Sequence, residues 1–357
     1  MTAKDLCPLT RRIAFTHKYQ TWVVSLTIDE MYCHAIAFAS QAAFGRQHDL
    51  QAARHFGKAL KLLRRRIEDS DNEAMIGDNT LMSIMVLATS ALVGGQLSTA
   101  REHLLGIKKI MALRGGFGSF TGSVKLFLEI LRCDIGVSLS TGSLPVFTKD
   151  PTTGMPWPLF NLAGLPSEDL RTITPSIDGR LVHIWESVKD FCRMVNNASL
   201  ANTQLPEQMF LDNMASSMYP LFGMEFETGS NSDMTRLSLL SFCSSSFLQW
   251  HNMGIRYTWL PTVYREALVH VGQRTDDIPP RITLWIFSIG AISGLMTDRS
   301  WLTARIYLAL RECDISSWAS MRKSLRRFPW IDFVHDEPMR KIYQAAMLLA
   351  PVSSDED

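Results

Sequence analysis

The sequence predicts an all-α protein of packed antiparallel helices in one large domain, with two lobes as the expected subdivision. Apolar residues recur at intervals of three and four along most of the chain, as on one face of a helix. No run of alternating β-branched residues bounded by hairpin turns occurs, and no glycine loop follows a strand-like segment. The composition of the 357 residues, 46% hydrophobic and 20% charged, is that of a globular protein.

The clearest helical pattern lies in the first third of the chain. Over 52–69 apolar residues share one face and basic residues the other, and 80–93 is almost entirely apolar. A third helix is expected over 99–113, where Thr99 and Glu102 have the capping-box spacing. A pair of glycines follows each of the last two helices. These short links predict three antiparallel neighbours packed face to face.

The later helices are interrupted by irregular segments. Residues 141–180 contain six prolines and four glycines, which predicts a long connection without regular structure. The polar segment Glu225–Asp233 predicts a mobile loop. The remaining helices are predicted over 123–140, 180–198, 234–250, 261–272, 280–296, 299–313, 316–326 and 337–349.

Charge, cysteines and hydropathy exclude several classes. The formal net charge is +1, which does not indicate a nucleic-acid surface. The six cysteines are far apart and form no C-x-x-C pair, so no local zinc site is predicted. The N-terminus lacks the apolar core of a signal peptide. The uncharged stretches 79–100, 237–255 and 282–297 are too polar or too short for a membrane span, so buried helices and no membrane partner are predicted. Membrane association through 79–100 is the third alternative, after the regulator and the enzyme.

The best enzyme alternative is a metal-dependent hydrolase of the HD phosphohydrolase type, which is also all-α. Such a site needs a His, an adjacent His-Asp pair and a later Asp around a metal. The candidates are the pairs His48–Asp49 and His335–Asp336, with His17 or His34 preceding the first. The dipeptide is common by chance, so a solvated turn is the preferred interpretation.

Other signatures give no site. Asp276–Asp277 lacks the further acid that a terpene cyclase needs, and the prolines after it break the helix. Ser320 and Lys323 match S-x-x-K, but K-T-G is absent and Ser70-Asp71-Asn72 stands in the wrong order. We therefore predict no catalytic, cofactor-binding or metal-binding residue, no cofactor, and no enzyme.

Two basic clusters and a series of packing motifs remain. The clusters are Lys61–Arg66 and Arg322–Arg327, which predict solvated helix faces or, alternatively, a nuclear-import signal. The motifs run in the order Ala59-Leu60…Leu63…Arg66, Asp78-Asn79-Thr80-Leu81, Gly94-Gly95, Ala100…His103-Leu104-Leu105-Gly106, Ile110-Met111, Arg114-Gly115-Gly116, Leu284-Trp285, Trp301, Trp318, Phe328-Pro329-Trp330 and Asp336.

This order of motifs resembles the regulatory region of fungal-specific transcription factors, the family of fungal binuclear zinc-cluster regulators. The resemblance covers roughly residues 35–345. It implies a regulatory domain over 35–350, with lobes at about 35–140 and 180–350. Residues 1–34 are then an N-terminal extension and 351–357 an acidic tail. The six closely spaced cysteines and basic linker of the family's zinc cluster do not occur in this sequence.

The resemblance also implies a function. A transcription regulator in a fungal nucleus is expected, acting as a regulatory and interaction domain without a DNA-binding module in this chain. Its expected partners are proteins, including the transcription machinery. A homodimer is compatible with this function. A small-molecule effector is also compatible with it, because 18 Met and 18 Phe can line a pocket between helices, although an ordinary core accounts for these residues equally. No direct DNA contact from this chain is expected.

Overall fold

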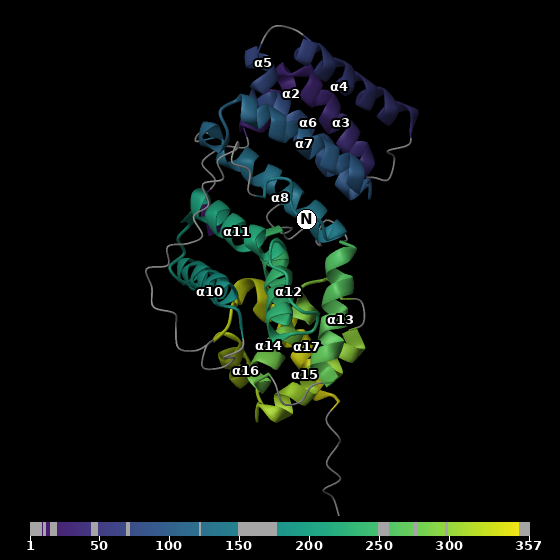
Figure 1. The fold of residues 1–357 in the computed structure, drawn as a ribbon. Helices are drawn as coiled ribbons and strands as arrows, with labels where there is room; N and C mark the ends of the chain where they lie inside the picture. Colours follow the sequence, from purple (N-terminus) through teal and green to yellow (C-terminus); the bar gives the residue numbers. More distant parts are fainter. Residues whose placement is uncertain are drawn as a thin grey trace, which may run out of the picture. The chain divides into compact units, whose positions relative to one another are not determined.

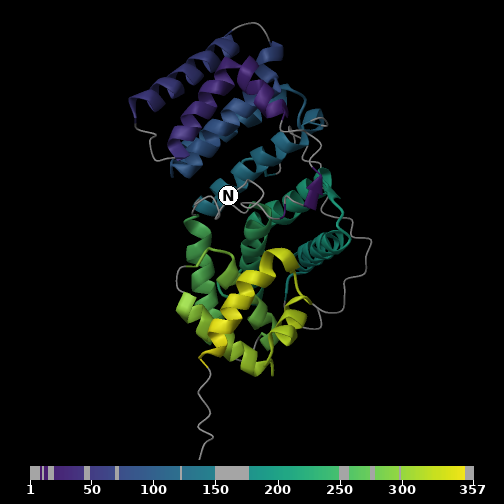
Figure 2. The same cartoon turned by 180° about the vertical axis from the view of Figure 1, so that it is seen from behind.

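A computed structural model describes residues 9, 12–14, 20–43, 49–68, 72–120, 123–148, 177–248, 257–273, 278–296 and 299–349 (Figures 1 and 2). Most of these residues form helices, and the one sheet among them pairs the two-residue strands β1 (Ile13–Ala14) and β2 (Leu205–Pro206). The all-α prediction is therefore confirmed. Within the described part of the chain, no helix combines the length and hydropathy that a bilayer crossing requires.

The chain divides into two compact units. The N-terminal unit comprises Phe15–Trp157 and Pro206–Leu211, and the C-terminal unit comprises Met1–Ala14, Pro158–Leu205 and Asp212–Asp357. Most of the proline-rich connection, residues 149–176, lies outside the described residues, as does the acidic tail.

The N-terminal unit is a group of helices in which α3 packs against α4 on one side and α6 on another, while α6 also packs against α7 and α8 (Figures 1 and 2). Its helices are α2 (Gln20–Ile28), α3 (Glu30–Ala43), α4 (Leu50–Glu68), α5 (Asn72–Ile76), α6 (Asp78–Val93), α7 (Leu97–Leu113), the short 3-10 helix η2 (Phe117–Phe120) and α8 (Val124–Thr141).

Two details of the predicted helices are wrong. The helix over 52–69 was expected to pack directly with its two successors, but α3, which was not predicted, lies between α4 and α6. In addition, α7 begins at Leu97 after Gln96, with no side chain capping its first turn. Thr99 therefore lies inside the helix and does not form the predicted capping box. Helix α2 and the start of α3 lie within residues 1–34, the predicted N-terminal extension.

The C-terminal unit is built around α14. This helix packs against α12, α13, α15, α16 and α17, and its residues from Leu284 to Gly290 are buried (Figures 1 and 2). The helices of this unit are α10 (Gly179–Leu200), α11 (Glu207–Phe222, in this unit from Asp212 on), α12 (Asn231–Cys243), the π-helix η3 (Ser244–Leu248), α13 (Trp259–Gln273), α14 (Pro280–Ile292), α15 (Arg299–Glu312), α16 (Trp318–Leu325) and α17 (Asp332–Met347).

The loop predicted over Glu225–Asp233 is shorter than expected. Ser230 is the N-cap of α12, and its hydroxyl accepts a hydrogen bond from the backbone N–H of Asp233 at 3.2 Å. Asp233 is buried in the first turn and its carboxylate accepts from Arg236 at 2.8 Å. A serine cap and an acid in the first turn both stabilise a helix start, so α12 begins at Asn231.

Candidate functional site

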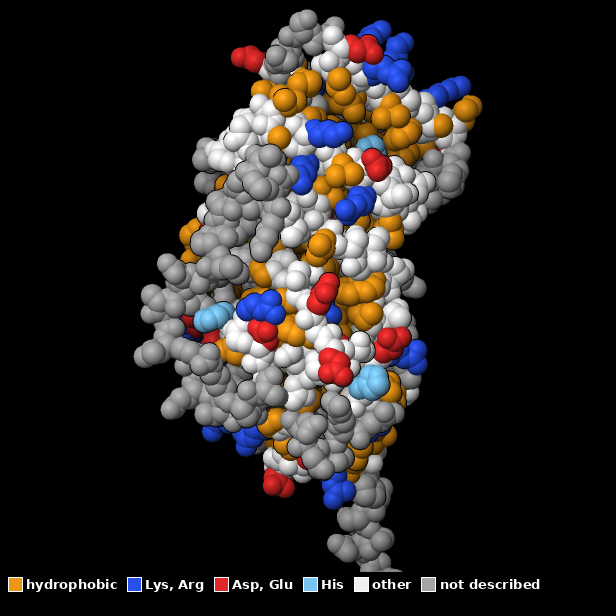
Figure 3. Space-filling model, viewed as in Figure 1, with side chains coloured by type: hydrophobic (Ala, Val, Ile, Leu, Met, Phe, Trp, Pro, Cys, Tyr) orange, Lys and Arg blue, Asp and Glu red, His pale blue; other side chains and the backbone are white. Residues whose placement is uncertain are grey.

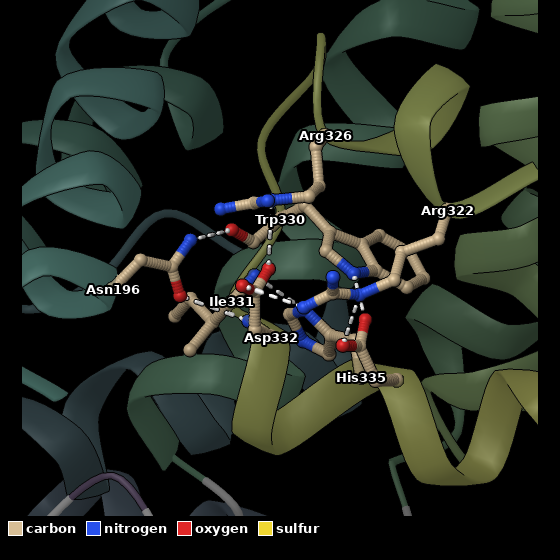
Figure 4. Close-up of polar contacts among 8 residues, drawn as sticks. Asn196, Arg322, Arg326, Trp330, Ile331, Asp332 and His335 are labelled. Atoms are coloured by element: carbon tan, nitrogen blue, oxygen red, sulfur yellow. Dashed lines mark hydrogen bonds and ion pairs between the residues drawn. The ribbon is translucent and has the colours of Figure 1, made fainter. Parts of the chain in front are cut away.

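A buried polar network in the C-terminal unit joins α10 to the start of α17 (Figure 4). Asn196 on α10 donates from Nδ2 to the carbonyl oxygen of Trp330 at 2.9 Å, and its Oδ1 accepts from the backbone N–H of Asp332 at 2.9 Å. Both ends of this buried amide are thereby used. The two bonds hold the turn before α17 against a helix 134 residues earlier in the chain.

Two carboxylates in the same network hold Arg322 (Figure 4). Its Nε donates to Asp336 Oδ2 at 2.6 Å and its Nη2 donates to Asp332 Oδ2 at 3.0 Å. Arg326 Nε lies 3.2 Å from Asp332 Oδ1, and Trp330 Nε1 donates to Asp336 Oδ1 at 2.8 Å. The hydrogen bond to Asp336 raises the pKa of Arg322. Its guanidinium is therefore charged and fixed in orientation.

His335 belongs to the packing of this network. Its Nδ1 accepts a hydrogen bond from the backbone N–H of Ile331 at 3.0 Å, and its ring lies against those of Phe242 and Trp330. Burial lowers the pKa of His335 to about 3, so the imidazole is neutral. Since Asp336 is also engaged, by Arg322, both members of the pair His335–Asp336 make packing or ion-pair contacts within the fold.

A groove of about 770 Å³ opens beside this network, on α16 and α17. Its lining is mostly charged. We call it the basic groove, and it is lined by Arg322, Lys323, Arg326 and Arg340, by the carboxylates Asp336 and Glu337, and by Trp318 and Ala319. The predicted cluster Arg322–Arg327 thus supplies three of its four cations. Sequence reasoning missed Arg340, which comes from α17.

The other basic cluster lies on α4. Arg54, Lys58, Lys61 and Arg65 recur at helical spacing, and Figure 3 shows Lys and Arg side chains gathered over this helix. We call these four residues the α4 stripe. A smaller hollow of about 370 Å³ lies along it. Arg66, at the end of the predicted cluster, instead turns inward and donates to Asp29.

Of the remaining candidates for an HD-type site, the structure describes His34 and Asp49. His34 Nδ1 lies 2.8 Å from His55 Nδ1, so these two rings of α3 and α4 contact each other. Asp49 is exposed. His17 and His48 lie outside the described residues. Among the residues that are described, no three His, Cys, Asp or Glu side chains come together as a metal site.

The other sequence signatures also have structural roles or lie outside the described residues. The Ser320 hydroxyl is at 3.0 Å from that of Ser317, the N-cap of α16, and both are exposed. Lys323 of the same S-x-x-K match lines the basic groove. Asp276–Asp277 and Ser70-Asp71 fall outside the part of the chain that the structure describes.

Replacing Asn196 by Leu is expected to lower the free energy of unfolding by about 2–4 kcal/mol, because one buried and one partly buried hydrogen bond to the backbone are lost. Chemical denaturation followed by circular dichroism measures the change. Asn197→Leu is the matched control, since Asn197 is the next residue on α10 and is exposed. Equal effects of the two substitutions would mean that the Asn196 amide does not stabilise the turn before α17.

In the N-terminal unit, two of the family-like motifs meet at one junction. Asp78 in the first turn of α6 pairs with Arg114 at the C-terminus of α7, and the Ser123 hydroxyl before α8 donates to the same carboxylate. The Arg114 guanidinium also lies over the Phe120 ring, 4.5 Å from its centroid. Asp78 and the Arg114 of the Arg-Gly-Gly motif therefore have a structural role: with Ser123 they join three helix ends.

Comparison with known families identifies this unit. Residues 18–155 match the sequence profile of the fungal specific transcription factor domain. No curated protein and no solved structure gives a significant match to the chain. The motifs after residue 155, such as those around Trp285 and Trp330, lie beyond the match, so their assignment stays a prediction. Over residues 18–155 the resemblance to the fungal specific transcription factor domain is confirmed.

Proposed function

We propose that this chain is a transcription regulator of a fungal nucleus that acts by contacting other proteins. In this proposal, residues 35–350 form the regulatory and interaction domain, and no part of this chain reads DNA bases directly. The match of residues 18–155 to the fungal specific transcription factor domain is the observation that carries the proposal.

The contacts of the motif residues support a binding role. Asp78, Arg114 and Ser123 hold helix ends together, and His335 and Asp336 are held in packing and ion-pair contacts. The surface, in contrast, presents the basic groove and the α4 stripe, which are charged features suited to recognising a partner. The chemistry that these residues support is therefore recognition.

A tethering experiment tests the proposal. The chain is fused to a heterologous DNA-binding domain in yeast, and transcription of a reporter with the matching binding sites is measured. We expect the fusion to raise or lower transcription several-fold relative to the DNA-binding domain alone. Fluorescence of a tagged, untethered chain is expected in the nucleus.

Two controls make the result decisive. Immunoblotting shows that the fusion accumulates to the level of the DNA-binding domain alone. A fusion carrying Asp78→Ala and Arg114→Ala, which removes the junction of three helix ends, is expected to lose the effect. A stable, nuclear wild-type fusion that leaves transcription unchanged would contradict the proposal.

A further inference from the structure

The basic groove has a surplus of positive charge on both of its helices. Asp336 is neutralised by Arg322, and Glu337 lies 3.0 Å from Lys341 Nζ. Among the described residues, no ion pair neutralises Lys323 on α16 or Arg340 on α17. A ligand that bridges the groove would therefore meet one uncompensated cation from each helix. This arrangement favours a ligand with at least two negative charges.

The same groove has an apolar surface. The Trp318 ring is half-buried and packs against Tyr343, with ring centroids 6.0 Å apart. The Arg340 guanidinium lies 5.9 Å from the centroid of the Trp318 ring. An apolar side chain of the ligand can cover the exposed part of this indole, which lies beside the cation. The groove thus combines the two features that recognise an acidic segment containing an apolar residue.

Arg322 makes the groove preorganised. Its Nε and Nη2 are bound to Asp336 and Asp332, and these bonds fix the guanidinium plane beside the groove before any ligand arrives. Asp332 is in turn held by Asn196, so the network of Figure 4 supports the groove from behind. A rigid charged wall loses little side-chain entropy on binding.

We propose that the basic groove is the docking site for a short acidic segment of a protein partner. Carboxylates of that segment pair with Lys323 and Arg340, and an apolar side chain packs on Trp318. This inference rests on the proposed function, because it names the chemistry of the partner through which such a regulator acts.

The carboxylates around the groove favour a peptide over a nucleic acid. Glu337 is 81% exposed and its ion pair with Lys341 is open to solvent, so a continuous phosphate backbone would pass close to this carboxylate. A peptide can place its acidic residues opposite the cations and neutral residues opposite these carboxylates. The hollow along the α4 stripe, in contrast, has no carboxylate among its lining residues. The stripe therefore serves as a comparison for binding by positive charge alone.

A binding experiment on the full chain tests this docking site. The probe is a fluorescent peptide of about 12 residues in which Asp and Glu alternate with Phe and Leu, and its anisotropy is followed during titration. Its isosteric counterpart with Asn and Gln carries no negative side chains. We expect the acidic peptide to bind and the Asn and Gln peptide not to bind. The double variant Lys323→Ala/Arg340→Ala should weaken its affinity by about tenfold.

The matched control is Lys58→Ala/Lys61→Ala, which removes the same charge from the α4 stripe. We expect it to change the affinity by less than about twofold. Thermal unfolding checks that both double variants remain folded. Equal losses in the two double variants would show general charge attraction and overturn the proposal. Binding of the Asn and Gln peptide, or displacement of the acidic peptide by a short DNA duplex acting at Lys323 and Arg340, would also overturn it.

The peptide titration and the reporter assay can fail separately. If the tethered chain changes transcription but the acidic peptide does not bind at the groove, the docking site is wrong and the proposed function stands. If the peptide binds at the groove and the tethered chain leaves transcription unchanged, the groove is a docking site and the proposed function is wrong.

Discussion

Trp285→Ala is expected to lower the free energy of unfolding by about 3–5 kcal/mol, the range for removing a fully buried aromatic side chain. Trp285 lies on the central helix α14 and is 0% exposed. Its ring meets that of Trp185 on α10 edge to face, with centroids 4.7 Å apart, and it also packs against Phe328. Its Nε1 donates to the carbonyl oxygen of Pro329 at 3.0 Å. Alanine removes all of these contacts and leaves a cavity.

Two further substitutions separate the causes of that loss. Trp285→Phe keeps an aromatic ring but leaves the Pro329 carbonyl without its donor, so we expect a loss of about half the size. Trp318→Ala removes an indole that is only half-buried at the basic groove, and a smaller loss is expected. Urea unfolding followed by circular dichroism measures all three. A loss below about 1 kcal/mol for Trp285→Ala would show that the core closes around the gap.

Helices with a distinct face could be predicted from the sequence, while a helix buried on several sides could not. Over α4 the basic residues mark the exposed face, and the predicted helix 52–69 lies within two residues of the observed Leu50–Glu68. In α3, apolar and small residues lie on most faces because α4 and α6 cover it on two sides. No single apolar stripe therefore stands out in residues 30–43, and the helix was missed.

The ends of helices depended on which groups cap them. Ser230 caps α12 with its side chain, a signal that the sequence contains. Gln96 precedes α7 without such a bond, so the nearest capping-box pattern, at Thr99, was misleading. The start of this helix follows instead from the tight turn before it, where Gly95 has a positive φ of 72°.

The candidate site could be predicted only in part, because its residues come from distant segments. The cluster Arg322–Arg327 is visible as a run of basic residues, but its meeting with Arg340 and Trp318 requires the packing of α16 against α17. Asn196 gives no sequence signal at all, since its two partners lie at Trp330 and Asp332. Side chains that satisfy buried backbone groups across such separations are set by tertiary structure.

The second large effect is a loss of stability in acid that depends on His335. The pKa of His335 falls from 6.5 in the unfolded chain to about 3 in the folded protein, because the ring is buried. Between these values the unfolded state binds one proton more than the folded state. The contribution of the neutral His335 imidazole to stability is therefore fully present above pH 6.5. It decreases by about 1.4 kcal/mol for each pH unit as the pH falls toward 3. The whole loss is on the order of 5 kcal/mol.

The variant His335→Asn isolates this contribution. An Asn side chain can place its Oδ1 near the position of Nδ1 and accept the hydrogen bond from the Ile331 N–H, but it does not titrate. We expect the variant to be less stable than the wild type at pH 7.5, where the packing of the imidazole is lost. The difference should shrink steadily as the pH is lowered to 4.5, measured as the urea midpoint at each pH.

Comparing the wild type with this variant also removes the contributions of other groups. Burial raises the pKa of Asp332, so this carboxyl binds its proton at a higher pH in the folded state than in the unfolded state. In both proteins it therefore opposes the loss of stability in acid. His183→Asn, at an exposed position of α10, is the matched control for the loss of an imidazole. If His335→Asn keeps the wild-type slope between pH 6.5 and 4.5, the imidazole is not buried in its neutral form. The contact with the Phe242 and Trp330 rings would then not exist in solution.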